Sequence, residues 1–301
     1  MKDKKRILGI FAALIANIIF GFSFIFSKLA LEHSHPLVIL SVRFTFAFIV
    51  LNLLLLTGKF KVSFKGKSVK KLILMALAQP LLYFIFELYG LSLVSSALSG
   101  VIIALVPVVV MILAVIFLNE KPTAMQVICT VISIIGVSAI SIVSNDGSKN
   151  YFLGVILLIF AVICASAFNI LSRSESKKFT PFERTYMMFL LSSVGFNLIA
   201  IFNLKGDFLP ILTESFKSFR FIAAIIYLSV LSSVLAFILY NYSTTVISVV
   251  ESSSFSNIIT VVTVLAGVLI LKESFSIAEY LLCGLIIFGV WGVNCFVKKK
   301  E

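Results

Sequence analysis

Ten apolar stretches, separated by short polar segments, make up most of this chain of 301 residues. Each stretch is about twenty residues long or longer, the length at which an α-helix crosses a hydrocarbon core of about 30 Å. The pattern predicts an all-α integral membrane protein with ten transmembrane helices. The expected spans cover residues 7–31, 36–57, 69–92, 94–118, 123–143, 151–172, 181–203, 218–242, 244–271 and 276–297.

A weak internal repeat relates the two halves of the chain. Toward the end of each half the offset is 153 residues, and toward the start it is 145 residues. The offset of 153 matches Phe84 with Phe237, Tyr89 with Tyr242, Glu120 with Glu273 and Gly136 with Gly289. The offset of 145 matches Ser27 and Lys28 with Ser172 and Arg173, and Pro36 with Pro181.

Each copy of the repeat holds five expected spans. Because five is odd, the second copy has to enter the membrane from the side opposite to the first, which makes an inverted-topology repeat. Many secondary transporters have this architecture and bind their substrate near the middle of the membrane. We expect a first five-helix repeat over residues 1–143, a short outer link over 144–150, and a second repeat with a basic tail over 151–301.

The charges of the chain favour the same class of protein. Only 13% of the residues are charged, against roughly 25% in a soluble domain, and the net charge is +12. The Lys and Arg residues flank the apolar stretches and concentrate in alternate loops, which by the positive-inside rule places both termini in the cytoplasm. We therefore expect a multi-pass protein of the cytoplasmic membrane, and no binding of nucleic acid.

The third expected span carries the strongest candidate site. Gln79, Tyr83 and Glu87 recur at every fourth position, so they share one face of an otherwise apolar helix. An ionisable side chain inside a bilayer is costly and is a functional candidate by default. Glu87 could bind a substrate amine or exchange a proton; alternatively, it holds the packing by a hydrogen bond to a neighbouring helix. At the matching position the second copy has Tyr240, so the site would be asymmetric.

The ninth expected span is rich in hydroxyl groups. Glu251 lies near its start, and Ser252, Ser256 and Asn257 follow within two turns. Such a density of polar groups suits the wall of a water-accessible cavity. The alternative is packing between helices through small residues, which is common in membranes, with Glu251 reaching the cytoplasmic interface.

Three further polar residues lie within spans. Asn17 and Asn169, in the first and sixth spans, are candidates for the same cavity, although a lone Asn in a membrane helix more often bonds to a neighbouring helix. Arg43 lies inside the second span, where we favour a structural role with Glu32 as its partner.

Other charged or metal-binding residue types have simpler interpretations. Glu120 and Glu273 end their helices beside Lys121 and Lys272, which favours ion pairs at the membrane interface. The two histidines lie on one outer loop and make an incomplete set of metal ligands. The sequence has no HExxH motif, no G-x-S-x-G motif and no glycine-rich phosphate loop. We expect no enzymatic activity, no metal and no cofactor.

The chain resembles the drug/metabolite transporter superfamily, and most closely its EamA-domain family. The resemblance covers nearly the whole chain and rests on the stretches GFSFIFSKLAL, PLVILSVRF, ALVPVVV, FLNEKPT and LILKESFS, with a Gly in IIGV and in IFGV. It implies a ten-helix protein whose central cavity is lined by the first, third, fourth, sixth, eighth and ninth spans, with the fifth and tenth at the periphery. It also implies the transport of metabolites, often outward.

We therefore expect a secondary transporter that exports small organic metabolites by alternating access, with amino acids or other amine-bearing compounds as the favoured substrates. A sugar-phosphate or nucleotide-sugar carrier would need cationic groups in its cavity, and apart from Arg43 none lies deep in a span. Such a carrier and a passive channel are the alternatives. The expected partners are the substrate, the lipid bilayer, and a coupling proton or a counter-substrate. The sequence does not define the oligomeric state.

Overall fold

The computed structural model describes residues 2–118, 123–144, 147–247, 252 and 255–295. Within these ranges the chain is helical and contains no strand. The helices of the first half are α1 (Lys2–Leu31), α2 (Pro36–Leu56), α3 (Lys70–Ala76), η1 (Leu77–Leu82), α4 (Tyr83–Leu93), α5 (Ser96–Ile103), α6 (Val106–Leu118) and α7 (Ala124–Val143). Those of the second half are α8 (Tyr151–Glu175), α9 (Pro181–Leu204), η2 (Lys205–Asp207), α10 (Phe208–Ser215), α11 (Phe219–Ile226), η3 (Tyr227–Leu235), α12 (Ala236–Val246), α14 (Ser256–Ile270) and α15 (Ile277–Cys295).

These helices make the chain a multi-pass membrane protein. Among the described residues, eight helical stretches are long and apolar enough to cross a membrane, and two shorter apolar helices, Ser256–Ile270 and Ile277–Gly292, follow them. The all-helical class agrees with the sequence prediction, and the eight long stretches correspond to its first eight spans. The ninth and tenth predicted spans correspond to the two shorter helices, and the eighth continues to Val246, beyond its predicted end. The short helix α10, which lies in the connection after α9, was not predicted.

Two of the predicted spans are broken rather than continuous. The third consists of α3, the π-helical η1 and α4, and within η1 the backbone of Gln79 leaves helical geometry (φ −147°, ψ 122°) just before Pro80. The fourth divides into α5 and α6 at residues 104–105, just before Pro107. A proline has no backbone N–H to donate and its ring crowds the preceding turn, so both breaks occur where the sequence places a proline.

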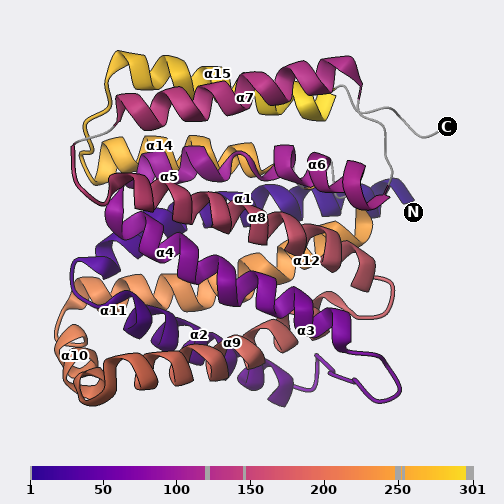
Figure 1. The fold of residues 1–301 in the computed structure, drawn as a ribbon. Coiled ribbons are helices and arrows are strands. Elements are labelled where there is room, and N and C mark those ends of the chain that lie inside the picture. Colours follow the sequence, from indigo (N-terminus) through magenta and orange to yellow (C-terminus); the bar gives the residue numbers. More distant parts are fainter. Residues whose placement is uncertain (1, 119–122, 145–146, 248–251, 253–254, 296–301) are drawn as a thin grey trace.

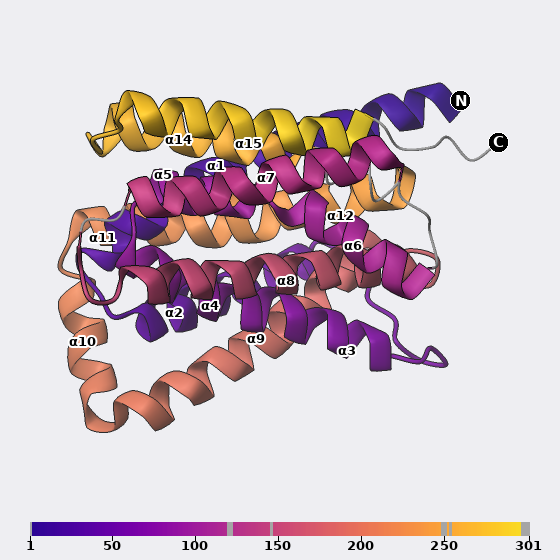
Figure 2. The same ribbon diagram turned by 45° about the horizontal axis from the view of Figure 1, so that its top comes forward.

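The helices pack in pairs that join the two halves of the chain. α4 lies along α8, α1 along α12 and α14, and α2 along α9 (Figure 1). α7 and α15 lie side by side at one edge of the molecule (Figure 1). Their outer faces carry exposed apolar side chains such as Ile135, Leu281 and Phe288, as expected of a surface in contact with lipid. The start of α1 and the end of α15 lie on the same side of the molecule, opposite α10 (Figure 2).

Candidate functional site

A narrow cavity lies where helices of both halves converge. The space that the centre of a water molecule can occupy in it is about 60 Å³. Its walls come from α1, η1, α4, α5, α6, α8, α12 and α14, which belong to the six spans that the family resemblance names as lining helices. The lining residues are Asn17, Phe20, Ser23, Phe24, Gln79, Tyr83, Phe84, Glu87, Ile103, Val106, Ala165, Phe168, Asn169, Phe237, Tyr240, Ser256 and Ile259.

Among the described residues of this lining, Glu87 is the acidic one. It lies on α4, its side chain is 2% exposed, and its Oε2 atom has no hydrogen-bond partner among the described residues. Gln79 and Tyr83 line the same cavity, so the structure brings together all three members of the polar face despite the break in the helix at Gln79. A buried carboxylate oxygen without a partner is unfavourable, and a bound cation or a proton would compensate for it.

The second half contributes a hydrogen-bonded pair to the cavity. The hydroxyl of Tyr240, on α12, donates a short hydrogen bond to Oδ1 of Asn169, on α8. The amide of Asn169 in turn donates to the carbonyl of Ala165, one turn earlier, over 2.9 Å. The amide of Asn17 makes the same type of bond to Ala13, over 2.7 Å. Unlike Glu87, the hydroxyl of Tyr240 therefore has a partner within the protein.

Aromatic rings make up about half of the remaining wall. The ring of Phe20 lies edge-on to Phe237, with centroids 5.1 Å apart, and to Tyr240, with centroids 6.1 Å apart. Tyr83 and Phe84 make a similar contact over 4.8 Å. These rings make the cavity suitable for an apolar or aromatic ligand body.

The predicted residues of the ninth span lie in different environments. Ser256 lines the cavity, whereas Ser252 is bonded to Ser243 over 3.0 Å and is not part of the lining. Asn257 is half-buried and also lies outside the lining, with an Oδ1 atom that has no partner among the described residues. Glu251 lies outside the described residues.

Arg43 has partners other than the one predicted. Instead of pairing with Glu32, its guanidinium donates to Ser233 Oγ and Ser232 Oγ, each over 3.0 Å. It also lies 4.2 Å from the centroid of the Phe84 ring, a cation–π contact. The expected partner was wrong because Arg43 faces inward toward η3 and is 1% exposed, too deep to reach the surface.

Glu273 is also bonded differently from the prediction. Its carboxylate accepts hydrogen bonds from Ser96 N and Ser96 Oγ, each over 2.8 Å, and from Ala97 N over 3.0 Å. It thus caps the start of α5 from the other half of the chain, where helix N–H groups lack partners within their own helix. The predicted ion pair with Lys272 was wrong for this reason. Its counterpart Glu120 lies outside the described residues.

Sequence reasoning missed a buried arginine. Arg184 is 0% exposed, and its guanidinium donates to Ser172 O over 2.8 Å, to Ser172 Oγ over 2.7 Å and to Thr245 Oγ1 over 2.6 Å. It also donates to Thr244 Oγ1 over 3.2 Å and, by a short bond, to Asn241 O. Arg184 therefore joins α8, α9 and α12 at one end of the molecule. Its position one turn inside a predicted span was the available signal.

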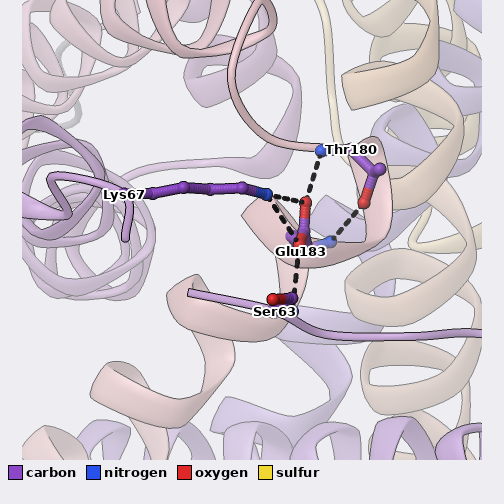
Figure 3. A network of polar contacts seen from close by, with 4 residues as sticks. All are labelled: Ser63, Lys67, Thr180 and Glu183. Carbon is purple, nitrogen blue, oxygen red and sulfur yellow. Dashed lines mark hydrogen bonds and ion pairs between the residues drawn. The ribbon is translucent and has the colours of Figure 1, made fainter. Parts of the chain in front are cut away.

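The residue before it, Glu183, holds a loop against the start of α9. Its carboxylate accepts from Ser63 N over 3.0 Å and from Lys67 Nζ over 3.2 Å (Figure 3). It also accepts from Thr180 N over 2.8 Å, while Thr180 Oγ1 accepts from Glu183 N, which completes a capping box (Figure 3). We refer to these four residues as the Glu183 cluster. It connects the α2–α3 loop of the first half with α9 of the second.

Comparisons with known proteins agree on one family of membrane transporters. The model of the EamA-like transporter family matches residues 7–142 and again 152–295. The uncharacterized transporter YcxC of Bacillus subtilis (strain 168) is 35% identical over 298 residues, which are 96% of this chain and 93% of that protein. An uncharacterized transporter of Archaeoglobus fulgidus is 25% identical over 93% of this chain and 95% of its own. A solved crystal structure, described only as that of a protein, has a TM-score of 0.66 at 14% identity over 96% of both chains, which shows a common fold.

Proposed function

The chain belongs to the EamA-like transporter family, and from this premise we propose that it is a secondary transporter that moves a small amine-bearing organic molecule across the cytoplasmic membrane by alternating access. The observation that carries the proposal is the carboxylate of Glu87, which lies buried, with one oxygen unpartnered, in a cavity walled by both halves. A transporter of this kind needs a central site and two halves able to move against one another.

Equivalent contacts along α2 and α9 support an inverted repeat. Ser41 Oγ donates to Asn197 Oδ1 over 2.7 Å, and Tyr186 Oη donates to Asn52 Oδ1 over 3.2 Å. The offset of 145 residues exchanges Ser41 with Tyr186 and Asn52 with Asn197. The same interface therefore contains two copies of one polar contact, in opposite directions, as a pseudo-two-fold axis between the halves requires.

A second pair of equivalent contacts lies at helix ends. Lys28 Nζ donates to the carbonyl of Leu91, near the end of α4, over 2.9 Å. Arg173 Nη1 donates to the carbonyl of Thr244, near the end of α12, over 2.6 Å. The offset of 145 residues matches Lys28 with Arg173, and the offset of 153 residues matches Leu91 with Thr244, so the two contacts are equivalent. A cation is favourable there because the carbonyls of a last helical turn lack partners within the helix.

A third pair lies between α7 and α15. A Cβ atom on Gly136 would collide with Ile286, and a Cβ atom on Gly289 would collide with Ser133. The offset of 153 residues matches Gly136 with Gly289 and Ser133 with Ile286, so the two close approaches are equivalent. Small residues that permit close approach are typical of contacts between membrane helices. Together with the common side on which α1 starts and α15 ends, these contacts support ten spans and an inverted repeat, and the Lys and Arg residues of alternate loops favour the cytoplasm for both termini.

The charge of the lining favours an amine as substrate. Within the part of the chain that the structure describes, the lining contains one acidic residue, Glu87, and no Lys or Arg. Arg43, which lies nearby, is occupied by Ser232, Ser233 and the ring of Phe84. An ammonium group can pair with Glu87, and aromatic rings can accommodate its apolar body. A sugar phosphate would instead bring negative charge to a buried carboxylate.

Thermal unfolding with a panel of compounds tests this proposal. A ligand that binds the folded state raises the melting temperature by mass action. We expect amino acids or other amines to stabilise the purified wild type, and Glu87→Gln to lose this shift while its melting temperature without ligand is retained or raised. The exposed Glu214 provides the control, because Glu214→Gln should keep the shift.

Other outcomes would lead to other functions. Stabilisation by sugar phosphates, or an equal response of Glu87→Gln to amines, would contradict the role proposed for Glu87. Uptake into proteoliposomes separates a transporter from a channel, because a transporter saturates with substrate concentration and a channel does not. Flux that rises linearly and is the same in Glu87→Gln would therefore contradict alternating access.

A further inference from the structure

The two halves place different residues at equivalent points of the cavity. The offset of 153 residues matches Glu87 with Tyr240, and the offset of 145 residues matches Phe24 with Asn169. All four line the cavity. The pair formed by Phe24 on α1 and Glu87 on α4 is therefore the counterpart of the pair formed by Asn169 on α8 and Tyr240 on α12.

In the second half, this pair is bonded internally. Tyr240 donates to Asn169 Oδ1, and the amide of Asn169 is held by the carbonyl of Ala165. Both side chains have their polar atoms directed at protein groups, so neither the hydroxyl of Tyr240 nor the amide of Asn169 requires a ligand. Buried polar groups in proteins generally have such partners.

In the first half, the corresponding partner is missing. Phe24 is 2% exposed and offers a hydrocarbon ring where the second half has an amide. Oε2 of Glu87 has no hydrogen-bond partner among the described residues. The first half thus has no polar side chain at the position equivalent to Asn169, which in the second half bonds to Tyr240.

We propose that Phe24 is a specificity-determining residue, which keeps the Glu87 carboxylate free of internal hydrogen bonds and so reserves it for the cationic group of the ligand. The proposal rests on the proposed function, because it concerns the same cavity. A site that holds a buried polar group without a partner discriminates strongly in favour of the ligand that supplies one. An internal amide partner would remove part of that preference by competing with the ligand.

The test introduces an amide side chain at position 24 and compares this variant with one that has an apolar side chain of similar shape there. Glutamate is shorter than tyrosine, so the longer amide of Phe24→Gln is more suitable than Asn to reach Glu87. Phe24→Met is the matched control, because methionine has nearly the length and volume of glutamine, suits a helix equally well, and has no amide. Both variants lose the aromatic ring, so their difference reports the amide alone.

The first measurement is thermal unfolding without ligand, in a double-mutant cycle with Glu87→Leu. We expect Phe24→Gln to melt at a higher temperature than Phe24→Met when Glu87 is present, and this advantage to disappear in the Glu87→Leu background. A cycle of this kind isolates the interaction between the two positions. An advantage of the same size in both backgrounds, or none in either, would overturn the proposal.

The second measurement is the binding of 2-phenylethylamine, a primary amine with an aromatic body. We expect Phe24→Gln to bind it roughly tenfold more weakly than Phe24→Met, since a hydrogen bond to a charged group is the interaction that competes. Equal affinities of the two variants would overturn the proposal. Glu87→Gln distinguishes this failure from that of the proposed function: if it binds the amine like the wild type, Glu87 is not the amine site at all.

Discussion

The connection after α2 and the connection after α9 occupy equivalent places in the two proposed repeats, yet they are attached to the protein in different ways. The α2–α3 loop is held at the start of α9 by the Glu183 cluster and by the stacked rings of Phe60 and Phe182, with centroids 4.6 Å apart. The connection after α9 contains α10, and Ser215 on this helix donates to the carbonyl of His33 over 3.1 Å.

The residue that makes the difference is Glu183. The offset of 145 residues matches it with Val38, a fully buried apolar residue near the start of α2. Valine can neither cap a helix nor bind a loop, whereas the carboxylate of Glu183 does both at once. The α2–α3 loop is therefore held to the start of α9 by an ionic contact, Lys67 with Glu183. The equivalent connection after α9 is held to the residues before α2 by a neutral hydrogen bond, from Ser215 to His33.

Of the substitutions that test this difference, removal of the Glu183 carboxylate should have the largest effect. We expect Glu183→Ala to lower the free energy of unfolding by about 2 kcal/mol, because it removes a capping residue and leaves N–H donors without their acceptor. The α2–α3 loop should also detach, so trypsin should cleave after Lys59, Lys61 and Lys65 faster than in the wild type. Melting temperature and the time course of cleavage measure the two effects.

The matched control for this variant is Glu214→Ala. Glu214 also pairs with a lysine, Lys217, over 2.6 Å, but both side chains are exposed and lie within one turn of each other. Such pairs contribute little to stability. If Glu214→Ala and Glu183→Ala changed the cleavage of the α2–α3 loop equally, the loop would not be held by the Glu183 cluster.

The sequence predicted the helices well because their length and apolar character are imposed by the membrane. The two interruptions lie beside Pro80 and Pro107, so the sequence contains the cause of each break. It could not predict partners that are far apart in the chain. Arg43 bonds to residues about 190 positions away, and Glu273 to residues about 177 positions away, and no local pattern specifies such contacts.

The candidate site was predictable in part for a similar reason. Glu87 stands out because a carboxylate within an apolar span is costly wherever it lies. Asn169 and Tyr240 were identified one by one as polar residues, but their bond to each other depends on how α8 and α12 pack. Phe24 has no polar atom, so its influence on Glu87 becomes visible only when the two halves are compared in space.

A smaller effect is expected at the connection after α9, where Ser215 bonds to His33. Ser215→Ala should lower the free energy of unfolding by about 1 kcal/mol or less, because it removes one neutral hydrogen bond and the hydroxyl also bonds within its own helix, to Ile211. Cleavage by trypsin after Lys205 and Lys217 should rise less than cleavage of the α2–α3 loop rises in Glu183→Ala. If cleavage rose more in Ser215→Ala than in Glu183→Ala, the connection after α9 would be the more firmly held of the two.

The smallest effect concerns the residues that cap α2 and α9, which are also equivalent: His35 and Thr180. His35 Nδ1 accepts from Leu37 N over 3.2 Å, and burial lowers the pKa of His35 below its ordinary value of 6.5. The neutral imidazole is thus favoured by folding, so its contribution to stability is present above about pH 6.5 and is lost as the pH falls through the lower pKa of the folded state. Thr180 does not titrate, and the pKa of Glu183, its partner in the capping box, lies below the ordinary value of 4.5, so this cap should not change between pH 7.5 and pH 5.

We therefore expect the wild type to lose stability between pH 7.5 and pH 5 and His35→Asn to lose less, because asparagine caps a helix without a titration. Melting temperatures over this range measure the difference, and His33→Asn, at an exposed position of the same loop, is the control. If both variants followed the wild type, the cap of α2 would not be the pH-sensitive group. A reduced slope in His35→Asn alone would show that the start of α2 weakens in acid while the start of α9, held by Thr180 and Glu183, does not depend on a histidine.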